Sequence, residues 1–319
     1  MNTENKKIKV TIMIPTYNQA GYIQEAIESA LAQTYPEIEV IVGDDASTDD
    51  TMQVVASIKD RRLKYVRNPL NLGRTKNYRN LLGNHACGDF VVNLDGDDYY
   101  TDFNFISEAV KLIGTNEKVV MIVAKATTKF MHREYVSEIP SHENSTGMEI
   151  LKNLPNRNYF FKHMAVLYAR KPAIEIDFYR SPALSSDWES LYRLALRGGV
   201  IYLDRNIGVW RIHGENESET INIEKLLENL TVWQTIYKDA IAFGMAPIIA
   251  KLRSARCVAF FAQSSCTRIS KAGNKDLIEF ISSVFKNYKL AFFVIALTPK
   301  YAARVAASIL GYYRRKNPI

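Results

Sequence analysis

Short apolar runs and amphipathic stretches take turns along the first part of the chain. Runs rich in β-branched residues predict buried strands at 9–15, 38–42, 63–67, 89–94 and 118–124. Between them, apolar residues recur at helical spacing and predict helices at 21–34, 49–58, 75–82 and 106–113. Strands that alternate with helices in this way favour an α/β fold with a doubly wound, Rossmann-like and mostly parallel sheet.

The pattern changes after the fifth predicted strand. Residues 127–149 are polar and irregular, which predicts loops or an insertion. A helix is expected at 187–196, followed by strands at 200–203 and 207–212. From 221 onward the signal is helical almost throughout. We therefore place a domain boundary near Thr220, with a first domain at 1–220 and a helical C-terminal region at 221–319.

The composition is that of an ordinary globular protein, with 319 residues of which 47% are hydrophobic and 24% are charged. The three cysteines, Cys87, Cys257 and Cys266, have no metal-ligand spacing and favour a reduced, cytoplasmic location. Residues 1–9 are polar and do not resemble a signal peptide. The longest apolar run, at 290–297, is too short to cross a bilayer.

The net charge of +7 is unevenly distributed. Residues 222–319 hold 15 lysines and arginines against five acidic residues, a net charge of +10, whereas residues 1–221 hold 26 against 29. A basic region without a nucleic-acid-binding motif favours an anionic membrane surface over nucleic acid. Aromatic and basic residues interleave at 286–316, which is typical of an interfacial anchor. The alternative is that these helices pack on the first domain or pair with a second subunit.

Polar segments follow three of the predicted strands, at 15–18 (PTYN), 44–45 (DD) and 95–98 (DGDD). The carboxyl ends of parallel strands meet at one edge of a sheet, where the ligands of open α/β sheets bind. Three carboxylates within 95–98 repel one another unless a cation or a ring of hydrogen-bond donors lies between them, and Mg²⁺ or Mn²⁺ bridging to a phosphate-bearing ligand fits this need. The simpler alternative for 95–98 taken alone is an Asp-rich surface turn.

Four motifs in order resemble those of the inverting nucleotide-sugar glycosyltransferases of family 2, of the bacterial surface-polysaccharide type. They are IPTYN (14–18), VGDDASTDDT (42–51), NLGRTKNYRN (71–80) and LDGDD (94–98). The resemblance covers roughly residues 8–220 and implies the GT-A fold. It also implies transfer of a sugar from a nucleotide donor, expected to be a UDP-sugar, to an acceptor hydroxyl.

The resemblance assigns nucleotide-side roles to residues in all four motifs. Tyr17 offers a stacking face for the base, Asp45 can accept a hydrogen bond from a uracil N–H, and Arg79 offers planar donors to a diphosphate. Asp95 is expected to approach the ribose. The full nucleotide-binding set implied is Pro15, Thr16, Tyr17, Asp45, Gly73, Lys76, Arg79 and Asp95.

The metal and the catalytic base are implied in the same way. Asp97 is expected to hold Mn²⁺ or Mg²⁺, with Asp98 as a candidate second contact, and His213, in the segment WRIHG, is expected to complete the site. Asp187 stands where the family places its general base, although Ser186 replaces the usual glutamate before it. Trp188 and Glu189 are expected on the acceptor side. The alternative reading of Asp187 is a cap for the helix that follows.

Two classes of function therefore remain. The first is an inverting, metal-dependent glycosyltransferase that acts on a lipid-linked oligosaccharide or surface polysaccharide, peripheral on the inner face of the membrane. The second is a non-catalytic nucleotide-sugar-binding or assembly subunit, which the missing glutamate before Asp187 keeps open. A nucleotide-dependent oxidoreductase is disfavoured because no G-x-G-x-x-G follows the first strand.

Overall fold

A computed structural model describes residues 7–114, 118–213, 222–271 and 276–316. The chain divides into two compact units. The first holds the chain up to Glu149 together with Arg157–Pro182 and Ser190–His213, and the second holds Ile150–Asn156, Ala183–Glu189 and the C-terminal helices. The predicted boundary near Thr220 lies outside the described residues.

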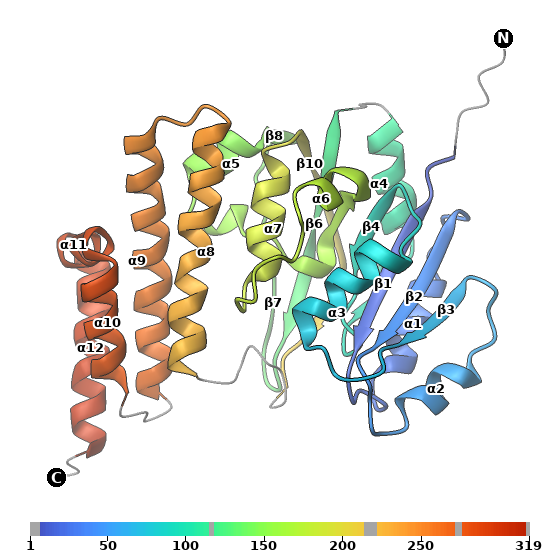
Figure 1. Ribbon diagram of the computed structural model, residues 1–319, viewed down its shortest axis with the longest axis horizontal. Coiled ribbons are helices and arrows are strands. Elements are labelled where there is room, and N and C mark those ends of the chain that lie inside the picture. Colours follow the sequence, from blue (N-terminus) through green and yellow to red (C-terminus); the bar gives the residue numbers. More distant parts are fainter. Residues whose placement is uncertain (1–6, 115–117, 214–221, 272–275, 317–319) are drawn as a thin grey trace. The chain divides into compact units, whose positions relative to one another are not determined.

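One mixed sheet forms the centre of the first unit (Figure 1). Its strands follow the order β3-β2-β1-β4-β9-β6-β10-β5, with β7 beside β6 and β8 beside β10. The strand bounds are β1 (Val10–Thr16), β2 (Ile38–Asp44), β3 (Leu63–Arg67), β4 (Phe90–Asn93), β5 (Tyr99–Tyr100), β6 (Val119–Lys129), β7 (Glu134–Val136), β8 (Asn144–Thr146), β9 (Val166–Ala169) and β10 (Gly199–Arg211).

The sheet is parallel from β3 through β4, β9 runs antiparallel between β4 and β6, and β6 and β10 pair in parallel. All seven residues of β1 and of β2 are buried, as their β-branched sequences predict for strands covered on both faces. Helices flank the sheet: α1 (Ile23–Leu31), α2 (Thr51–Ser57), α3 (Arg74–Asn80), α4 (Phe105–Gly114) and α6 (Arg170–Glu175). The predicted fold class is confirmed, with parallel crossovers placing the ends of β1, β2 and β4 at one edge.

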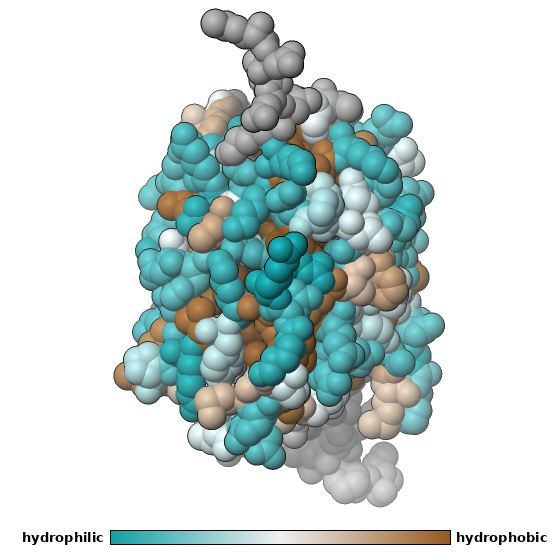
Figure 2. Space-filling view, turned by 90° about the vertical axis from the view of Figure 1, so that its right-hand side faces the viewer, coloured by the Kyte–Doolittle hydropathy of each residue, from teal (hydrophilic) through white to brown (hydrophobic). Residues whose placement is uncertain are grey.

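The edge of the sheet at β3 faces the viewer in Figure 2, where hydrophilic side chains cover most of the surface. On β3 itself, Lys64 forms an ion pair with Glu39 and Arg67 forms one with Asp44. Charged side chains on an edge strand discourage pairing with the strands of other molecules. The sheet therefore ends on this side in a protected edge.

Two predictions about the middle of the chain are wrong in part. The region 127–149 is not simply loops, because β6 runs on to Lys129 and the region also contains β7, β8 and the start of α5 (Gly147–Asn153). The strands expected at 200–203 and 207–212 form one strand, β10, whose pairing with β6 shifts register on either side of Asn206. Such bulges admit the polar residues 204–206 without ending the strand.

The second unit contains five helices within its described residues, as the helical signal after 221 predicts. They are α8 (Ile223–Ala242), α9 (Pro247–Lys271), α10 (Leu277–Asn287), α11 (Lys289–Leu297) and α12 (Pro299–Lys316). Trp233 on α8 and Phe261 on α9 stack with ring centroids 4.9 Å apart. Two further helices, α5 and α7 (Ser186–Ala195), begin in one unit and end in the other.

Among the described helices, none is by itself long and apolar enough to cross a membrane. The pair α10 and α11 passes the same length and composition test jointly, but the chain bends by 112° between them.

Candidate active site

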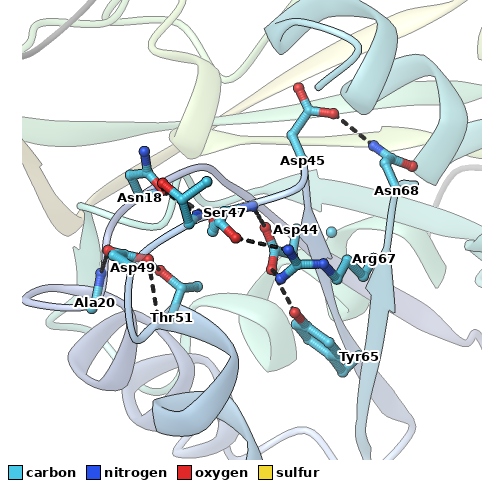
Figure 3. Close-up of polar contacts among 12 residues, drawn as sticks. Asn18, Ala20, Asp44, Asp45, Ser47, Asp49, Thr51, Tyr65, Arg67 and Asn68 are labelled. Atoms are coloured by element: carbon cyan, nitrogen blue, oxygen red, sulfur yellow. Dashed lines mark hydrogen bonds and ion pairs between the residues drawn. The ribbon is translucent and has the colours of Figure 1, made fainter. Parts of the chain in front are cut away.

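The loop after β2 is built around a buried carboxylate (Figure 3). Asp44 is fully buried and accepts hydrogen bonds from the Ser47 backbone N–H (2.7 Å), the Tyr65 hydroxyl (2.5 Å) and the Arg67 guanidinium (3.1 Å). Burial and the charge of Asp44 raise the pKa of Tyr65 to about 12, so its hydroxyl stays a donor. Asp44 therefore has a structural role in the loop, and its neighbour Asp45 makes a different set of contacts.

The loop after β1 is fastened to the loop after β2. Asn18, in the left-handed region with φ 52°, donates its backbone N–H to the Ser47 hydroxyl and accepts the Thr48 N–H at 2.7 Å. The Ala20 N–H is held by Asp49, whose pKa is lowered because hydrogen bonds outweigh its partial desolvation. These bonds fix the turn that presents Tyr17, whose side chain is 46% exposed. An exposed ring on a fixed turn suits stacking against a base.

Asp45 holds the segment that leads into α3. Its carboxylate accepts hydrogen bonds from Asn68 Nδ2 (2.8 Å), the Leu72 N–H (2.9 Å) and the Gly73 N–H (2.8 Å). Gly73 adopts φ +85°, a conformation that favours glycine. A carboxylate has about four acceptor positions, so roughly one is left for a ligand N–H. The expected uracil contact of Asp45 stays a prediction, beside a structural role that sequence reasoning missed.

The DGDD segment passes close to the end of β1. Gly96 donates its N–H to the Pro15 carbonyl at 3.2 Å. A Cβ at Gly96 would lie 2.5 Å from the Gln19 amide oxygen and 2.8 Å from the Thr16 hydroxyl. Only glycine fits this approach without movement. The predicted meeting of the first and fourth motifs at one edge of the sheet is confirmed.

Asp97 and His213 meet across this edge. The His213 Nε2 atom lies 2.9 Å from an Asp97 carboxylate oxygen, and the imidazole stacks on Tyr22 with ring centroids 5.2 Å apart. The Asp97 side chain is largely buried, with 10% exposed, and that of His213 is 23% exposed. The pairing of these two residues is what the sequence predicts for a shared site.

The third carboxylate of the segment, Asp98, is turned into the protein. It accepts the Arg211 backbone N–H at 2.9 Å, and the Arg211 guanidinium donates to the Asp97 carbonyl at 2.8 Å. Burial, together with the charges of Asp97 and Asp95, raises the pKa of Asp98 well above its usual value. Asp98 therefore anchors the end of β10, which carries His213 towards Asp97.

Asp95 and Tyr78 form the inner wall of the site. The Tyr78 hydroxyl donates to Asp95 at 2.6 Å, and burial raises the pKa of Asp95. The Arg74 guanidinium lies 5.7 Å from the Tyr78 ring centroid, and its charge opposes the rise in the pKa of Asp95. Arg74 is thus a cation beside Asp95 that sequence reasoning passed over.

The two basic residues chosen from the sequence on α3 have different surroundings. Arg79 forms an ion pair with Asp177 at 2.5 Å, so its guanidinium is engaged within the protein. Lys76 is exposed on α3. Arg74 is the guanidinium whose charge acts on Asp95, and the expected diphosphate contacts of Arg79 and Lys76 stay predictions. The helical pattern alone could not show this, because Arg74 precedes the predicted start of the helix.

A histidine given no role from the sequence, His163, lies behind Asp95. Its Nε2 atom lies 2.7 Å from the Tyr179 hydroxyl, which donates to the Asn93 amide oxygen at 2.9 Å. Burial lowers the pKa of His163 to about 4, so the imidazole is neutral near pH 7. No local motif marks His163, and only the antiparallel strand β9 brings it beside β4.

The donors present fit one divalent cation. Two ligands at right angles, each about 2.1 Å from an octahedral ion, lie about 3.0 Å apart, close to the 2.9 Å between Asp97 and His213. A carboxylate oxygen with an imidazole nitrogen suits Mn²⁺, and Mg²⁺ takes carboxylates with phosphates and waters. Within the described part of the chain, no cluster of three or more acidic, histidine or cysteine ligands occurs.

The predicted base and acceptor-side residues lie in the second unit, whereas the nucleotide-side residues lie in the first. Asp187 is in the first turn of α7, where the helix dipole favours a carboxylate. Trp188 packs on Trp233 and Phe261, with ring centroids 6.0 Å and 5.4 Å away. Glu189 is buried. The roles of Asp187, Trp188 and Glu189 therefore stay predictions.

Solved structures share this architecture. The chain of TarS 1–349 of Staphylococcus aureus in complex with UDP-GlcNAc superposes with a TM-score of 0.72 at 21% identity, covering 97% of this chain and 93% of that one. The mannosyltransferase PcManGT of Pyrobaculum calidifontis, in complex with GDP-Man and Mn²⁺, gives 0.57 at 17% identity over 98% and 89%. At these identities the likeness shows the GT-A fold with C-terminal helices.

Sequence relatives cover less of the molecule. An uncharacterized protein of Mycobacterium tuberculosis is 27% identical over 72% of this chain, and the chain spans 62% of that relative's length. The Escherichia coli protein WfaP, a UDP-Glc:alpha-D-GlcNAc-diphosphoundecaprenol beta-1,3-glucosyltransferase, is 42% identical over 28% of this chain and 36% of its own. The family model for glycosyl transferase family 2 matches residues 11–176. That span holds all four motifs and the Asp95–Asp97 edge, and the chain belongs to glycosyl transferase family 2.

Proposed function

We propose that this protein transfers a sugar from a UDP-sugar to a hydroxyl of a lipid-linked oligosaccharide or surface polysaccharide, with inversion at the anomeric carbon. The observation that carries the proposal is the Asp97–His213 pair, 2.9 Å apart at the strand edge that also presents Tyr17 and Asp95. The names of the relatives support the substrate class. TarS is seen with UDP-GlcNAc and with UDP, and WfaP is named for a UDP-Glc donor and a diphosphoundecaprenol-linked acceptor.

The nucleotide is held by the residues of the edge. The Tyr17 ring stacks on the uracil, the remaining acceptor position of Asp45 takes a base N–H, and Asp95 accepts from the ribose. Arg74 donates to the diphosphate, a role for which a guanidinium is well shaped. Asp97 and His213 would hold Mn²⁺ or Mg²⁺, which when bound supplies a Lewis acid that stabilises negative charge on the diphosphate.

Transfer itself needs one base. Asp187 takes the proton of the acceptor hydroxyl as its oxygen attacks the anomeric carbon and the bond to the UDP oxygen breaks. A single displacement of this kind inverts the configuration. The basic C-terminal region, with its net charge of +10, keeps the protein on the anionic inner face of the membrane, where a lipid-linked acceptor resides.

The test is transfer with a defined product. The purified protein is incubated with Mn²⁺, a panel of UDP-sugars and a diphospholipid-linked saccharide, and the new linkage is assigned by NMR. We expect one UDP-sugar to give a product of inverted anomeric configuration. A product of retained configuration would exclude the single displacement, and saturable UDP-sugar binding without transfer to any acceptor would favour a binding subunit.

A further inference from the structure

The helical unit contains a pocket of its own, distant in sequence from every residue of the proposed active site. It has a volume of about 690 Å³ and lies where the second half of α8, the first half of α9 and the bend between α10 and α11 come together. Four lysines from these three places line it: Lys238, Lys251, Lys286 and Lys289. In Figure 1 the connection from α8 to α9 lies at the top of the helical unit.

The four ammonium groups have no ion-pair partner among the residues that the structure describes. All four lysines are exposed, and no described acidic side chain lines the pocket or forms an ion pair with any of them. Like charges gathered around one cavity repel one another unless an anion lies among them. A phosphate group, with several acceptor oxygens, is the anion that lysines commonly bind.

The floor of the pocket is apolar beneath this charged rim. Ala250, Ala255, Val258 and Ala291 line it and are buried. Tyr237 also lines it, but its hydroxyl is already committed to the Leu151 carbonyl at 2.7 Å. An apolar floor does not stabilise a fully hydrated anion. An amphiphile fits the pocket better, because its phosphate matches the lysine rim and its apolar stem matches the floor.

Large apolar side chains stand exposed beside the pocket. Ile241, which lines the pocket, is 40% exposed, and Phe243 just beyond α8 is 41% exposed. On the first turns of α9, Ile248 is 63% and Leu252 is 43% exposed, one helical step from the face that carries Lys251. Exposed apolar residues interleaved with lysines are typical of a surface that enters the headgroup region of a bilayer.

We propose that this pocket binds the phosphate headgroup of an anionic phospholipid, while Ile241, Phe243, Ile248 and Leu252 enter the leaflet around it. Charge complementarity favours a lipid surface, since the region carries a net charge of +10 and the pocket combines unpaired lysines with an apolar floor. The inference extends the proposed membrane-side function by naming the surface that docks, and it does not depend on any step of sugar transfer.

The test is cosedimentation of the full-length protein with vesicles of phosphatidylcholine alone or mixed with phosphatidylglycerol. We expect binding only to the mixed vesicles. Because each lysine near an anionic surface contributes about 1 kcal/mol, the double variant Lys238→Gln/Lys289→Gln should bind at least about tenfold more weakly. The variant Ile248→Ser/Leu252→Ser should also lose binding. UDP titration and the melting temperature should not change in either variant, which separates this result from the proposed active site.

A charge-matched control removes two lysines outside the pocket, Lys225 on α8 and Lys300 on α12. If Lys225→Gln/Lys300→Gln weakens vesicle binding as much as the pocket variant, the attraction is diffuse and the pocket has no specific role. Binding that survives the pocket variant overturns the proposal as well. Inorganic phosphate distinguishes the source of the anion: tight phosphate binding at these lysines without vesicle binding would show a soluble ligand instead of a lipid surface.

Discussion

The three carboxylates of the DGDD segment lie within one turn, yet each faces a different partner. Asp95 accepts from Tyr78, Asp97 pairs with His213, and Asp98 accepts the Arg211 backbone N–H. A solvated surface turn would not need three separate sets of contacts drawn from α3 and β10. The geometry therefore favours a binding site over the simple Asp-rich turn that the segment alone could have been.

The metal assignment predicts a specific loss at Asp97. Asp97→Asn removes the charge of the protein's carboxylate ligand, so turnover should fall by at least roughly 100-fold and should no longer respond to added Mn²⁺. Steady-state transfer rates across a Mn²⁺ titration measure this. The matched control is Asp204→Asn, since Asp204 is 80% exposed on β10 and should retain both rate and Mn²⁺ response. Full activity of Asp97→Asn would remove the assignment.

The base assignment predicts a loss of rate without a loss of donor affinity. Asp187→Asn should lower turnover by roughly 10²–10⁴-fold, which is the usual contribution of a general base. UDP binding, measured by calorimetry in parallel, should stay within error of the wild type because Asp187 takes no part in the nucleotide contacts. If UDP affinity falls together with the rate, Asp187 has a structural role as a helix cap.

Gly96 is expected to tolerate no side chain. In Gly96→Ala the new methyl would meet the Thr16 hydroxyl at 2.8 Å, and such overpacking typically costs about 1–3 kcal/mol of unfolding free energy. Gly83→Ala is the control, since nothing lies within 4 Å of a Cβ there. Chemical denaturation of both variants measures the difference. Equal stability of the two would mean that the close approach of residues 95–98 to β1 is absent.

At the scale of elements, the strands that the sequence predicts best are those buried on both faces. β1 and β2 are rich in β-branched residues, and their observed bounds lie within two residues of the prediction. The missed strands lack that signal: Glu134–Val136 is exposed on the edge of the sheet, and Val166–Ala169 is only four residues long. Their strand structure comes from pairing with β6, which no local pattern reveals.

Within the site, residues marked by local motifs could be predicted, whereas residues placed by tertiary packing could not. Asp97 and His213 follow from motifs, and the sheet topology brings them together. The choice between Arg74 and Arg79 depends on which face of a single short helix meets Asp95, and a run of polar residues does not encode it. His163 reaches the site through a strand that joins β4 from far along the chain.

The hydrogen bonds around Glu39, at the opposite end of the parallel strands, predict that the folded protein loses stability in acid. Glu39 on β2 is desolvated, but hydrogen bonds from Lys64, Thr11, Cys87 and Lys9 outweigh this and lower its pKa to about 2. Because that pKa is lower in the folded than in the unfolded state, the stabilisation is complete above about pH 4.5 and is lost as the pH falls towards 2.

Glu39→Gln should therefore destabilise the protein by on the order of 2 kcal/mol at pH 7, and the difference from the wild type should shrink as the pH is lowered from about 4.5. Denaturation curves at a series of pH values measure this. Glu37→Gln is the control, since Glu37 is 42% exposed and its pairing with Lys7 at 3.4 Å is worth little. A pH-independent difference between Glu39→Gln and the wild type would contradict the assignment.

At the scale of the whole molecule, we propose that the charge asymmetry of the sequence separates two functions, nucleotide binding and membrane binding. The first unit, close to neutral, carries the nucleotide edge, and the basic helical unit carries the four-lysine pocket. Helices α5 and α7 belong to both units, and Asp187 lies on one of these shared helices.

The central claim is that Asp97 and His213 hold a divalent ion that in turn holds a nucleoside diphosphate. Isothermal titration of UDP into the full-length protein, with and without Mn²⁺, tests it most directly. We predict saturable binding with Mn²⁺ and at least roughly tenfold weaker binding without it. Equal affinity under both conditions, or no binding of UDP under either, would contradict this account of the site.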